Sequence, residues 1–440
     1  MSTADHQQPT GHEVAVVGLG YVGLTIAVAL ADAGVRVLGY DVNTRLTAAL
    51  RRGEFPFYEP GIPEAHATLP PGRFDIVDEL PDVLPPAVIV CVGTPVDDTT
   101  HQPELRYLHA ALDTLVPRLT DETLVILRST VPVGTSRTVV LPRLASRVER
   151  PLLAFSPERT IQGKALRELR ELPQVIGALD ERSLARAKEL LGRLNRNQTA
   201  VSSLEAAEMV KLICNCHTDL IYGFGNEVAL MAESLGLDAD EVIAAANHDY
   251  PRPDLNRPGF VGGSCLVKDP YLLMRSTERG GYFPPLVSAA RRLNEQVPYH
   301  VADRVMRALK ANERVDEARV LICGLAYKGW PVTDDVRGAP SVPIIEALRD
   351  HVGEIVAHDH MVGAERAAGM GVRLVGLEEG FAGADAALVL INHPGYRDAD
   401  IERLIATMRR PAVVFDAWGI YKDRLASKAG ELTYLRLGRG

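Results

Sequence analysis

The sequence predicts an α/β protein made of two Rossmann-like, doubly wound parallel-sheet domains joined by a central helical domain. Three observations support this. The chain opens with a strand, a glycine loop, a helix and a second strand that ends in an acid. A similar order of elements recurs from residue 318. Residues 202–309, between these two segments, form a mostly helical pattern. A length of 440 residues fits two or three domains. We place them at 13–201, 202–310 and 311–440, after a disordered tail at 1–12.

The composition excludes several classes of protein. Hydrophobic residues make up 46% and charged residues 24%, and no apolar run reaches the ~18 to 20 residues that span a bilayer. A net charge of −9 without a basic block argues against a nucleic-acid partner. The polar first dozen residues lack the order of a secretion signal, and five cysteines are a low, odd count. We therefore expect a cytoplasmic protein that binds neither nucleic acid nor membrane.

The first α/β unit is the clearest part of the chain. The apolar run Val14–Val17 is a buried strand, and the glycine loop GLGYVG follows it at 18–23. A helix over 24–33 ends at Gly34, a favourable C-terminal cap, and a second strand delivers Asp41. Strand, loop, helix, strand and acid together make one βαβ unit.

The glycine loop predicts a dinucleotide site. The outer glycines allow a tight turn and close helix packing, and Gly20 lets a pyrophosphate approach the backbone N–H groups of the helix N-terminus. Asp41 can hold both hydroxyls of an adenosine ribose, and its carboxylate repels a 2′-phosphate. The predicted cofactor is therefore NAD rather than NADP. The alternative is a glycine-rich turn without a ligand.

A second motif, GGSCLVKD at 262–269, places a cysteine directly after two glycines. The glycines bring the backbone close to a ligand and leave the Cys265 thiol accessible. Lys268 and Asp269 follow, an ammonium that favours a thiolate and a carboxylate that can activate water. A nucleophile and an ordinary packed cysteine both fit this pattern.

Further polar candidates lie on the central helices and after strands. Lys211 and Asn215 share one helix face, which is either part of a site or a solvated stripe. Gly93-Thr94-Pro95, Ser129–Gly134 and Ser156–Arg159 each follow an apolar run. Because ligands bind at the carboxyl ends of strands in open α/β sheets, we expect these three loops to converge on one edge.

No metal site is predicted. His358 and His360 flank Asp359 without a further ligand at suitable spacing. Cys91 and Cys323 lie in strand-like apolar runs and are expected to be core residues. Cys214 and Cys216, two residues apart on a helix, face different sides and are not expected to bind a metal.

Together these motifs resemble those of the UDP-glucose/GDP-mannose dehydrogenase family, the nucleotide-sugar 6-dehydrogenases. The resemblance runs from His12 to about Asp423. Its motifs stand in one order: GLGYVG (18–23), FYEPG (57–61), STVPVGT (129–135), SPER (156–159), EMVKLICN (208–215), GGSCLVKD (262–269), GLAYK (324–328) and DDVR (334–337). Members of the family use two NAD molecules in succession to oxidise the C6 alcohol of a nucleotide-activated hexose to a carboxylate.

The resemblance implies a role for each matching residue. Cys265 resembles the thiol that traps the C6 aldehyde as a thiohemiacetal and then becomes a thioester. Lys211 and Asn215 resemble the pair that stabilises the developing oxyanion, and Asp269 the group that assists water in hydrolysis. Glu158 and Thr130 resemble residues that position the sugar and a catalytic water.

The resemblance also implies binding residues and a partner. NAD contacts are implied for Gly18, Gly20, Tyr21, Val22, Gly23, Asp41, Thr94, Thr130 and Arg337. Substrate contacts are implied for Glu158, Lys211, Asn215, Arg252, Phe260, Gly262, Gly263, Cys265, Tyr327 and Lys328. The arginine at 252 matches one that the family supplies from a partner subunit, so a homodimer through the middle helices is implied, with higher oligomers left open.

Departures from the family pattern leave the sugar open. Gly93 stands where members often have proline, and Gln162 stands where UDP-glucose dehydrogenases have a second glutamate. SPER and the Pro-Arg at 251–252 resemble the UDP-N-acetylmannosamine and UDP-N-acetylglucosamine branch, whereas GGSCLVKD resembles the glucose and mannose branch. Our leading interpretation is a UDP-glucose 6-dehydrogenase type, with UDP-N-acetylhexosamine, TDP-hexose and GDP-hexose dehydrogenases as alternatives.

Two other classes fit the sequence less well. A β-hydroxyacid or 6-phosphogluconate type dehydrogenase needs neither the cysteine motif nor a second α/β domain, and both are present. A non-catalytic nucleotide-sugar sensor would be free to lose Cys265, Lys211 or Asp269, and all three remain.

Overall fold

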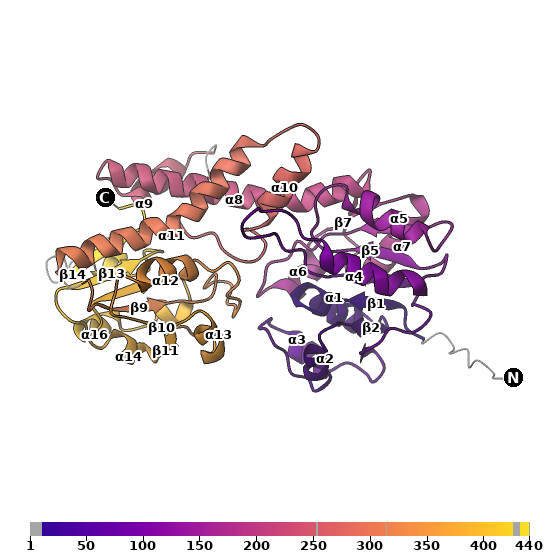
Figure 1. Ribbon diagram of the computed structural model, residues 1–440, viewed down its shortest axis with the longest axis horizontal. Helices are drawn as coiled ribbons and strands as arrows, with labels where there is room; N and C mark the ends of the chain where they lie inside the picture. Colours follow the sequence, from indigo (N-terminus) through magenta and orange to yellow (C-terminus); the bar gives the residue numbers. More distant parts are fainter. Residues whose placement is uncertain (1–10, 252–253, 314, 426–431, 440) are drawn as a thin grey trace. The chain divides into compact units, whose positions relative to one another are not determined.

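The computed structural model describes residues 11–251, 254–313, 315–425 and 432–439 (Figure 1). The chain forms two compact units. The first contains residues 1–214 and 271–283, and the second contains residues 215–270 and 284–440. Of the predicted tail, residues 1–10 lie outside the described residues, whereas His12 pairs with Asp75 at 2.8 Å. The division into three domains at the predicted boundaries stays a prediction.

The first unit is built on an eight-stranded sheet in the order β3-β2-β1-β4-β5-β6-β7-β8. All pairs are parallel except β6 with β7. The strands are β1 Val14–Val17, β2 Val37–Tyr40, β3 Phe74–Val77, β4 Ala87–Val90, β5 Leu124–Leu127, β6 Leu152–Phe155, β7 Gln174–Ala178 and β8 Gln198–Ala200. Apart from the long helix described below, its α-helices are α1 Tyr21–Asp32, α2 Thr44–Arg51, α3 Ile62–Ala67, α4 Arg106–Leu115, α5 Leu141–Ala145, α6 Ala165–Glu171, α7 Glu181–Leu191 and α10 Asp269–Glu278, the last of which begins in the second unit.

Alternation along the central strands fills two cores, one on each face of this sheet. In β1, Val14 and Val16 pack with α1, α6 and α7, and Ala15 and Val17 pack with α4 and the start of α8. Helices therefore cover both faces, as the doubly wound prediction requires. Helix α1 begins three residues earlier than predicted, because the last residues of the glycine motif form its first turn.

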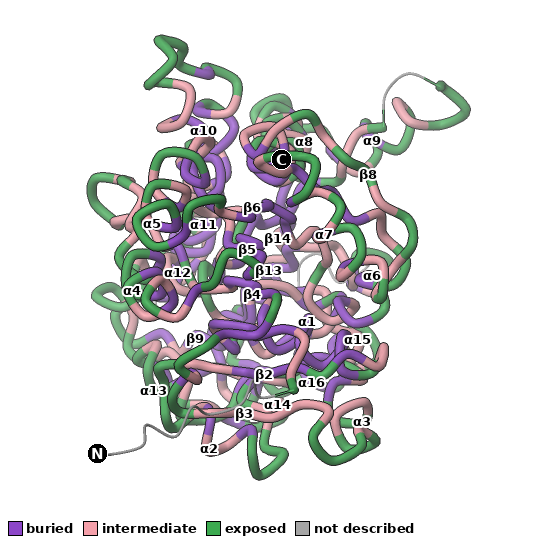
Figure 2. Tube along the Cα trace, turned by 90° about the vertical axis from the view of Figure 1, so that its right-hand side faces the viewer, coloured by how far each residue is buried: buried purple, intermediate pink, exposed green. Residues whose placement is uncertain are grey.

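The second unit contains a six-stranded, wholly parallel sheet in the order β11-β10-β9-β12-β13-β14. The strands are β9 Arg319–Cys323, β10 Glu354–His358, β11 Arg373–Leu374, β12 Ala386–Val389, β13 Ala412–Asp416 and β14 Leu432–Arg436. Its helices are α9 Ala239–Asn247, α11 Pro285–Ala311, α12 Ser341–Arg349, α13 Ala364–Gly369, α14 Leu377–Phe381, α15 Pro394–Arg397, α16 Ile401–Ala406 and α17 Lys422–Leu425. One apolar core joins this sheet to α11 and the helices around it. The central strands of both sheets, such as β4, β5, β12 and β13, are buried, whereas the edge strand β3 is coloured as intermediate in Figure 2.

The long helix α8, Leu204–Ser234, belongs to both units. Residues 204–214 belong to the first unit, and residues 215–234 to the second. The predicted helical stretch is confirmed, because α8, α9, α10 and α11 occupy most of residues 204–311. Within the described residues, no helix combines the length and the apolarity that a membrane crossing requires.

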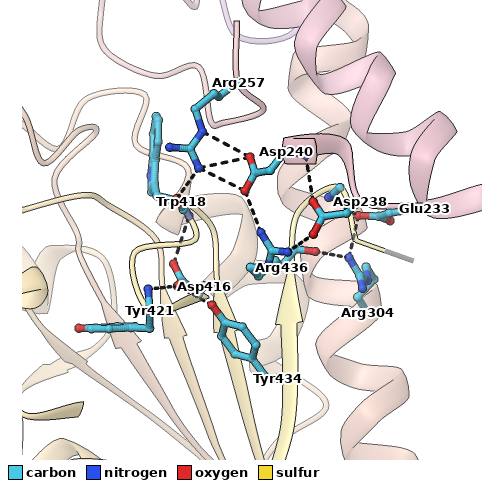
Figure 3. A network of polar contacts seen from close by, with 11 residues as sticks. Glu233, Asp238, Asp240, Arg257, Arg304, Asp416, Trp418, Tyr421, Tyr434 and Arg436 are labelled. Atoms are coloured by element: carbon cyan, nitrogen blue, oxygen red, sulfur yellow. Dashed lines mark hydrogen bonds and ion pairs between the residues drawn. The ribbon is translucent and has the colours of Figure 1, made fainter. Parts of the chain in front are cut away.

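An ion network ties the end of the chain to the helices of the second unit (Figure 3). The guanidinium of Arg436, on β14, contacts the carboxylates of Asp238 and Asp240 at the N-terminus of α9. Arg304, on α11, binds Glu233 on α8 at 2.7 Å and donates to the carbonyl of Arg436 at 2.6 Å. These contacts hold β14 against α8, α9 and α11.

Candidate active site

The glycine loop of the first unit has the geometry that a dinucleotide needs. Gly18 has a φ of +91°, and a Cβ there would lie 2.8 Å from the carbonyl oxygen of Cys91. A Cβ on Gly23 would lie 1.7 Å from the carbonyl oxygen of Gly18. Gly20, at the N-terminus of α1, faces open space instead. The outer glycines therefore serve the fold, and the central one leaves room for a pyrophosphate beside the helix N-terminus. The loop fits NAD.

The residues around this loop are also in place. Tyr21 and Val22 form the first turn of α1, and the Tyr21 ring stacks on Phe57 with centroids 4.0 Å apart. Asp41 follows β2; its carboxylate accepts from the backbone N–H groups of Leu19 at 2.7 Å and Asn43 at 2.8 Å. A carboxylate has about four lone-pair sites, so these two bonds leave capacity for ribose hydroxyls.

The three loops after strands meet at one edge of the first sheet, as predicted. They follow β4, β5 and β6, which are neighbouring parallel strands. The Thr94 hydroxyl donates to the carbonyl of Thr130, and Ser129 Oγ donates to the carbonyl of Val92 at 2.7 Å. Thr130 is thus held beside Thr94, which is 5% exposed.

Glu208 on α8 fixes the second of these loops. Its carboxylate accepts from the backbone N–H of Gly134 at 2.5 Å and of Ser136 at 2.7 Å. Burial raises the pKa of Glu208, and these hydrogen bonds oppose the rise. Helix α8 therefore binds the loop one turn before Lys211, which is itself only 7% exposed. Lys211 does not lie on a solvated stripe.

Glu158 is held by an arginine that the sequence analysis did not single out. Arg128 Nη2 lies 2.7 Å from Glu158 Oε2, with side chains 1% and 12% exposed. Arg128 also donates to the carbonyl of Ser156 at 3.1 Å, and Glu158 Oε1 accepts from the Thr160 N–H at 2.9 Å. Burial acts to raise the pKa of Glu158, but Arg128 and Thr160 hold it below the ordinary value. Glu158 is therefore a fixed carboxylate at neutral pH.

Glu59, inside the FYEPG motif, is a second buried anchor without a predicted role. It is 4% exposed, and its carboxylate accepts from the N–H groups of Gly163 at 2.7 Å and Ala165 at 2.8 Å. It thereby fixes the segment that follows SPER, including Gln162. The sequence signal for Arg128 is an arginine directly after the buried strand β5. For Glu59 the only signal is its place in the FYEPG motif, which does not indicate what the carboxylate binds.

In the second unit, the glycine pair packs against the loops of the C-terminal sheet. A Cβ on Gly262 would lie 2.7 Å from the carbonyl oxygen of Gly338, and one on Gly263 would lie 2.9 Å from the Tyr327 ring. Phe260, 7% exposed, precedes them in the core of this unit. Two residues after this glycine pair, Cys265 is exposed.

The carboxylate of Asp269 lies at the centre of a polar cluster. It is inaccessible to solvent and receives the Asn215 amide at 2.5 Å and the Lys268 ammonium at 2.8 Å. The Asp269 N–H donates to the carbonyl of Cys265 at 2.9 Å, which closes the turn that carries the thiol. The Lys268 ammonium thus pairs with the Asp269 carboxylate, and not with the Cys265 thiol as predicted from the sequence.

Tyr327 and Lys328 follow β9, and Arg337 lies in the DDVR segment. The Tyr327 N–H donates to the carbonyl of Asp335 at 3.0 Å, and Lys328 Nζ lies 5.3 Å from the centroid of the Tyr327 ring. Arg337 makes a two-pronged contact with Asp335 at 2.7 and 2.9 Å, with its side chain 54% exposed. Arg252 lies outside the described residues.

The structure brings the candidates together in two sets. The first unit holds the glycine loop, Asp41, Thr94, Thr130, Glu158 and Lys211, and the second holds Asn215, the cysteine loop, Asp269, Tyr327, Lys328 and Arg337. Lys211 and Asn215 are one turn apart on α8, where the chain passes from one unit to the other.

The other four cysteines differ in burial. Burial raises the pKa of Cys91 and of Cys216 to about 12, and Cys323 is buried in β9. Cys214 is exposed, so the prediction that it and Cys216 face different sides of α8 is confirmed. No group of three or more metal-ligating side chains with suitable geometry occurs in the described part of the chain.

Comparison with known families covers most of the sequence. Residues 12–195 match the NAD binding domain of the UDP-glucose/GDP-mannose dehydrogenase family, residues 205–296 its central domain, and residues 321–423 its UDP binding domain. The NAD prediction is thereby confirmed.

Individual relatives agree. A UDP-N-acetyl-D-mannosamine dehydrogenase from Pyrococcus horikoshii is 33% identical to this chain, over 93% of this chain and 96% of the relative's length. One from Escherichia coli K12 is 30% identical, over 87% of this chain and 94% of the relative's length. The solved structure of a UDP-ManNAc dehydrogenase from P. horikoshii covers 97% of this chain and 99% of its own, with 32% identity and a TM-score of 0.87. That of a UDP-glucose dehydrogenase from Pyrobaculum islandicum covers 100% of both, with 28% identity and a TM-score of 0.83. The chain belongs to the UDP-glucose/GDP-mannose dehydrogenase family and is an NAD-dependent nucleotide-sugar dehydrogenase.

Proposed function

We propose that this enzyme oxidises the C6 alcohol of a UDP-N-acetylhexosamine, of the UDP-N-acetylmannosamine type, to the carboxylate. The names of the relatives from P. horikoshii and E. coli support this alternative over the UDP-glucose type that led the sequence analysis. The SPER motif and the Pro-Arg at 251–252 favour the same branch. The observation that carries the reaction type is the exposed Cys265 thiol on a turn closed by Asp269, which Asn215 also binds.

The side chains fit a four-electron oxidation in two stages. NAD, when bound, accepts one hydride in each stage. In the first, Lys211 and Asn215 stabilise the oxyanion that forms on C6; an asparagine amide has two N–H donors, so one remains while the other binds Asp269. In the second, the Cys265 thiolate adds to the aldehyde, and loss of the second hydride leaves a thioester. Asp269 then orients the water that releases the acid and the thiol.

Glu158 and Thr130 are proposed to position the sugar and this water. The Arg128 contact keeps Glu158 ionised and fixed in direction, so it can accept hydrogen bonds from sugar hydroxyls or a water. Contacts with the nucleotide sugar are proposed for Arg252, Phe260, Gly262, Gly263, Tyr327 and Lys328, and Arg337 is proposed to contact NAD.

The substrate assignment is tested by NADH release with UDP-N-acetylmannosamine, UDP-N-acetylglucosamine, UDP-glucose, TDP-glucose and GDP-mannose. We expect the highest kcat/KM for a UDP-N-acetylhexosamine, and two NADH per sugar with no aldehyde accumulating. A site built to bind the acetamide loses those hydrogen bonds with a plain hexose, which lowers kcat/KM. A higher kcat/KM for UDP-glucose would overturn the sugar assignment, and one NADH per sugar would overturn the thioester mechanism.

The cofactor preference gives a second prediction. NAD should be preferred over NADP by at least about 10-fold in kcat/KM, because the Asp41 carboxylate would face the 2′-phosphate. Asp41→Asn should narrow this ratio, since the amide removes the repelling charge. Steady-state kinetics with both cofactors checks it. Comparable kcat/KM values in the unmodified enzyme would mean that the exposed Arg45, four residues further on, outweighs the carboxylate.

We also propose a homodimer through α8. Exposed apolar side chains lie along this helix and at its end: Phe224 and Met231, seven residues apart and each 49% exposed, and Leu235, directly after its last residue and 71% exposed. Phe224→Glu should therefore shift the enzyme from dimer to monomer in light scattering at micromolar concentration. Val83→Glu, at a residue 48% exposed in the first unit, is the matched control and should leave the mass unchanged. A monomeric unmodified enzyme would refute the proposal.

A further inference from the structure

A buried polar network joins α8 and α11 in the second unit and lies outside the sequence motifs. Asp219 and Asn226 on α8 are 1% and 0% exposed, and Arg291 and Asn294 on α11 are 1% and 2% exposed. Arg291 Nη1 donates to Asp219 Oδ1 at 2.7 Å, and Asn294 Nδ2 donates to the same oxygen at 3.0 Å. Asn226 Nδ2 donates to Asn294 Oδ1 at 2.8 Å. The four side chains form one connected row.

This row holds the cysteine loop at two points. Asn226 binds both backbone groups of Gly259: its Nδ2 donates to the carbonyl at 2.9 Å, and the Gly259 N–H donates to Asn226 Oδ1 at 2.9 Å. At the other end, Arg291 Nη1 donates to the carbonyl of Leu266 at 3.0 Å. Leu266 is the residue directly after Cys265, so the two anchors bracket the segment that carries the thiol.

The network is not needed merely to join the two helices. They already approach closely, since a Cβ on Gly223 would lie 3.0 Å from the Cβ of Ala290. Packed apolar residues often join helices as well as a buried ion pair does, because burying charges carries a desolvation cost. That cost is visible here: burial raises the pKa of Asp219 despite the opposing effect of Arg291. A buried ion pair bonded to the loop backbone therefore points to a role in the loop.

We propose that Arg291 is a positioning residue for the Cys265 thiol. By binding the Leu266 carbonyl it fixes the turn that presents the nucleophile, while Asp219, which Asn294 holds in turn, fixes the guanidinium. The inference rests on the proposed function, in which Cys265 traps the aldehyde. Positioning of this kind has large kinetic effects, because a displacement of about 1 Å at a reacting atom can cost about 100-fold in rate.

The test compares stability with turnover in a set of full-length variants. Arg291→Met leaves Asp219 buried without its cation, so it should lower both the melting temperature and kcat. The double variant Asp219→Asn/Arg291→Met removes both charges and keeps an oxygen for Asn294. We expect it to regain melting temperature but to keep kcat lowered by about 10-fold or more, with the KM for NAD unchanged. Arg291→Lys, which restores a cation, should recover part of kcat.

The matched control is Arg304→Met, which breaks a second α11–α8 ion pair, to Glu233. Its guanidinium otherwise binds the carbonyls of Arg436 and Arg439, so its loss should lower the melting temperature and leave kcat unchanged. If kcat recovers with stability in the double variant, Arg291 is only structural and the inference is wrong. If Cys265→Ala retains full turnover, the proposed function itself fails. If Arg291→Met does not fold, the double variant and Arg291→Lys still decide.

Discussion

Replacing Cys265 with serine is expected to stop the enzyme midway, with steady-state turnover reduced on the order of 10³-fold or more. In the proposed mechanism the first hydride leaves an alcohol carbon, and the oxyanion on that carbon is stabilised by Lys211 and Asn215 rather than by the thiol. The second must leave a tetrahedral adduct of the aldehyde, and a serine hydroxyl is a far weaker nucleophile near neutral pH. Any ester that formed would also hydrolyse more slowly than a thioester. The first oxidation should therefore survive in part.

Intact-protein mass spectrometry of Cys265→Ser after incubation with substrate and NAD checks this, since a stalled covalent ester appears as a nucleotide-sugar adduct. Cys214→Ser is the matched control because Cys214 is the other exposed thiol. It should turn over as the unmodified enzyme does. Full steady-state activity of Cys265→Ser would reduce this cysteine to a packing residue, and the reaction would need another nucleophile.

Local sequence patterns sufficed for the elements that present the site. The glycine loop, its strand and its helix follow from spacing, because the outer glycines are required by close contacts within the loop and with the end of the neighbouring strand β4, and the central one leaves room for a ligand. The convergence of Thr94, Thr130 and Glu158 followed from one rule about parallel sheets, and β4, β5 and β6 are neighbours as that rule requires. The predictions for the glycine loop and for these three residues depended only on the order of parallel strands, which a βαβ pattern determines.

The buried residues that support the site could not be predicted from local sequence patterns. Arg128, Glu59 and Arg291 are buried charges whose partners lie 30, 104 and 72 residues away, at Glu158, Gly163 and Asp219. A single charged residue in an apolar stretch indicates that a partner exists, but the sequence does not show which residue that partner is. The sugar was left open for another reason, since SPER and the Pro-Arg at 251–252 resemble one branch of the family and GGSCLVKD resembles the other.

A large loss of stability is expected from Arg436→Met, in the ion network shown in Figure 3. The Arg436 side chain is 5% exposed and pairs with Asp238 and Asp240, whose side chains are 30% and 18% exposed. Removing one partner of a buried pair costs about 3 to 5 kcal/mol. Because the two carboxylates retain some contact with water, we expect the lower end, about 3 kcal/mol. For a unit of about 200 residues this lowers the melting temperature by roughly 6 to 12 °C.

The control and the pH dependence separate this network from a general loss of charge. Arg257→Met removes an arginine that also pairs with Asp240 but is 56% exposed, so it should cost less than about 1 kcal/mol. Burial acts to raise the pKa of Asp238, and Arg436 holds it below the ordinary value. The stabilisation from this carboxylate is therefore complete above the unfolded pKa, about 3.9, and is lost as pH falls through the lower folded pKa. The difference in melting temperature between the unmodified enzyme and Arg436→Met should shrink below about pH 4. Equal melting temperatures for Arg436→Met and Arg257→Met at pH 7 would show that burial adds nothing at Arg436.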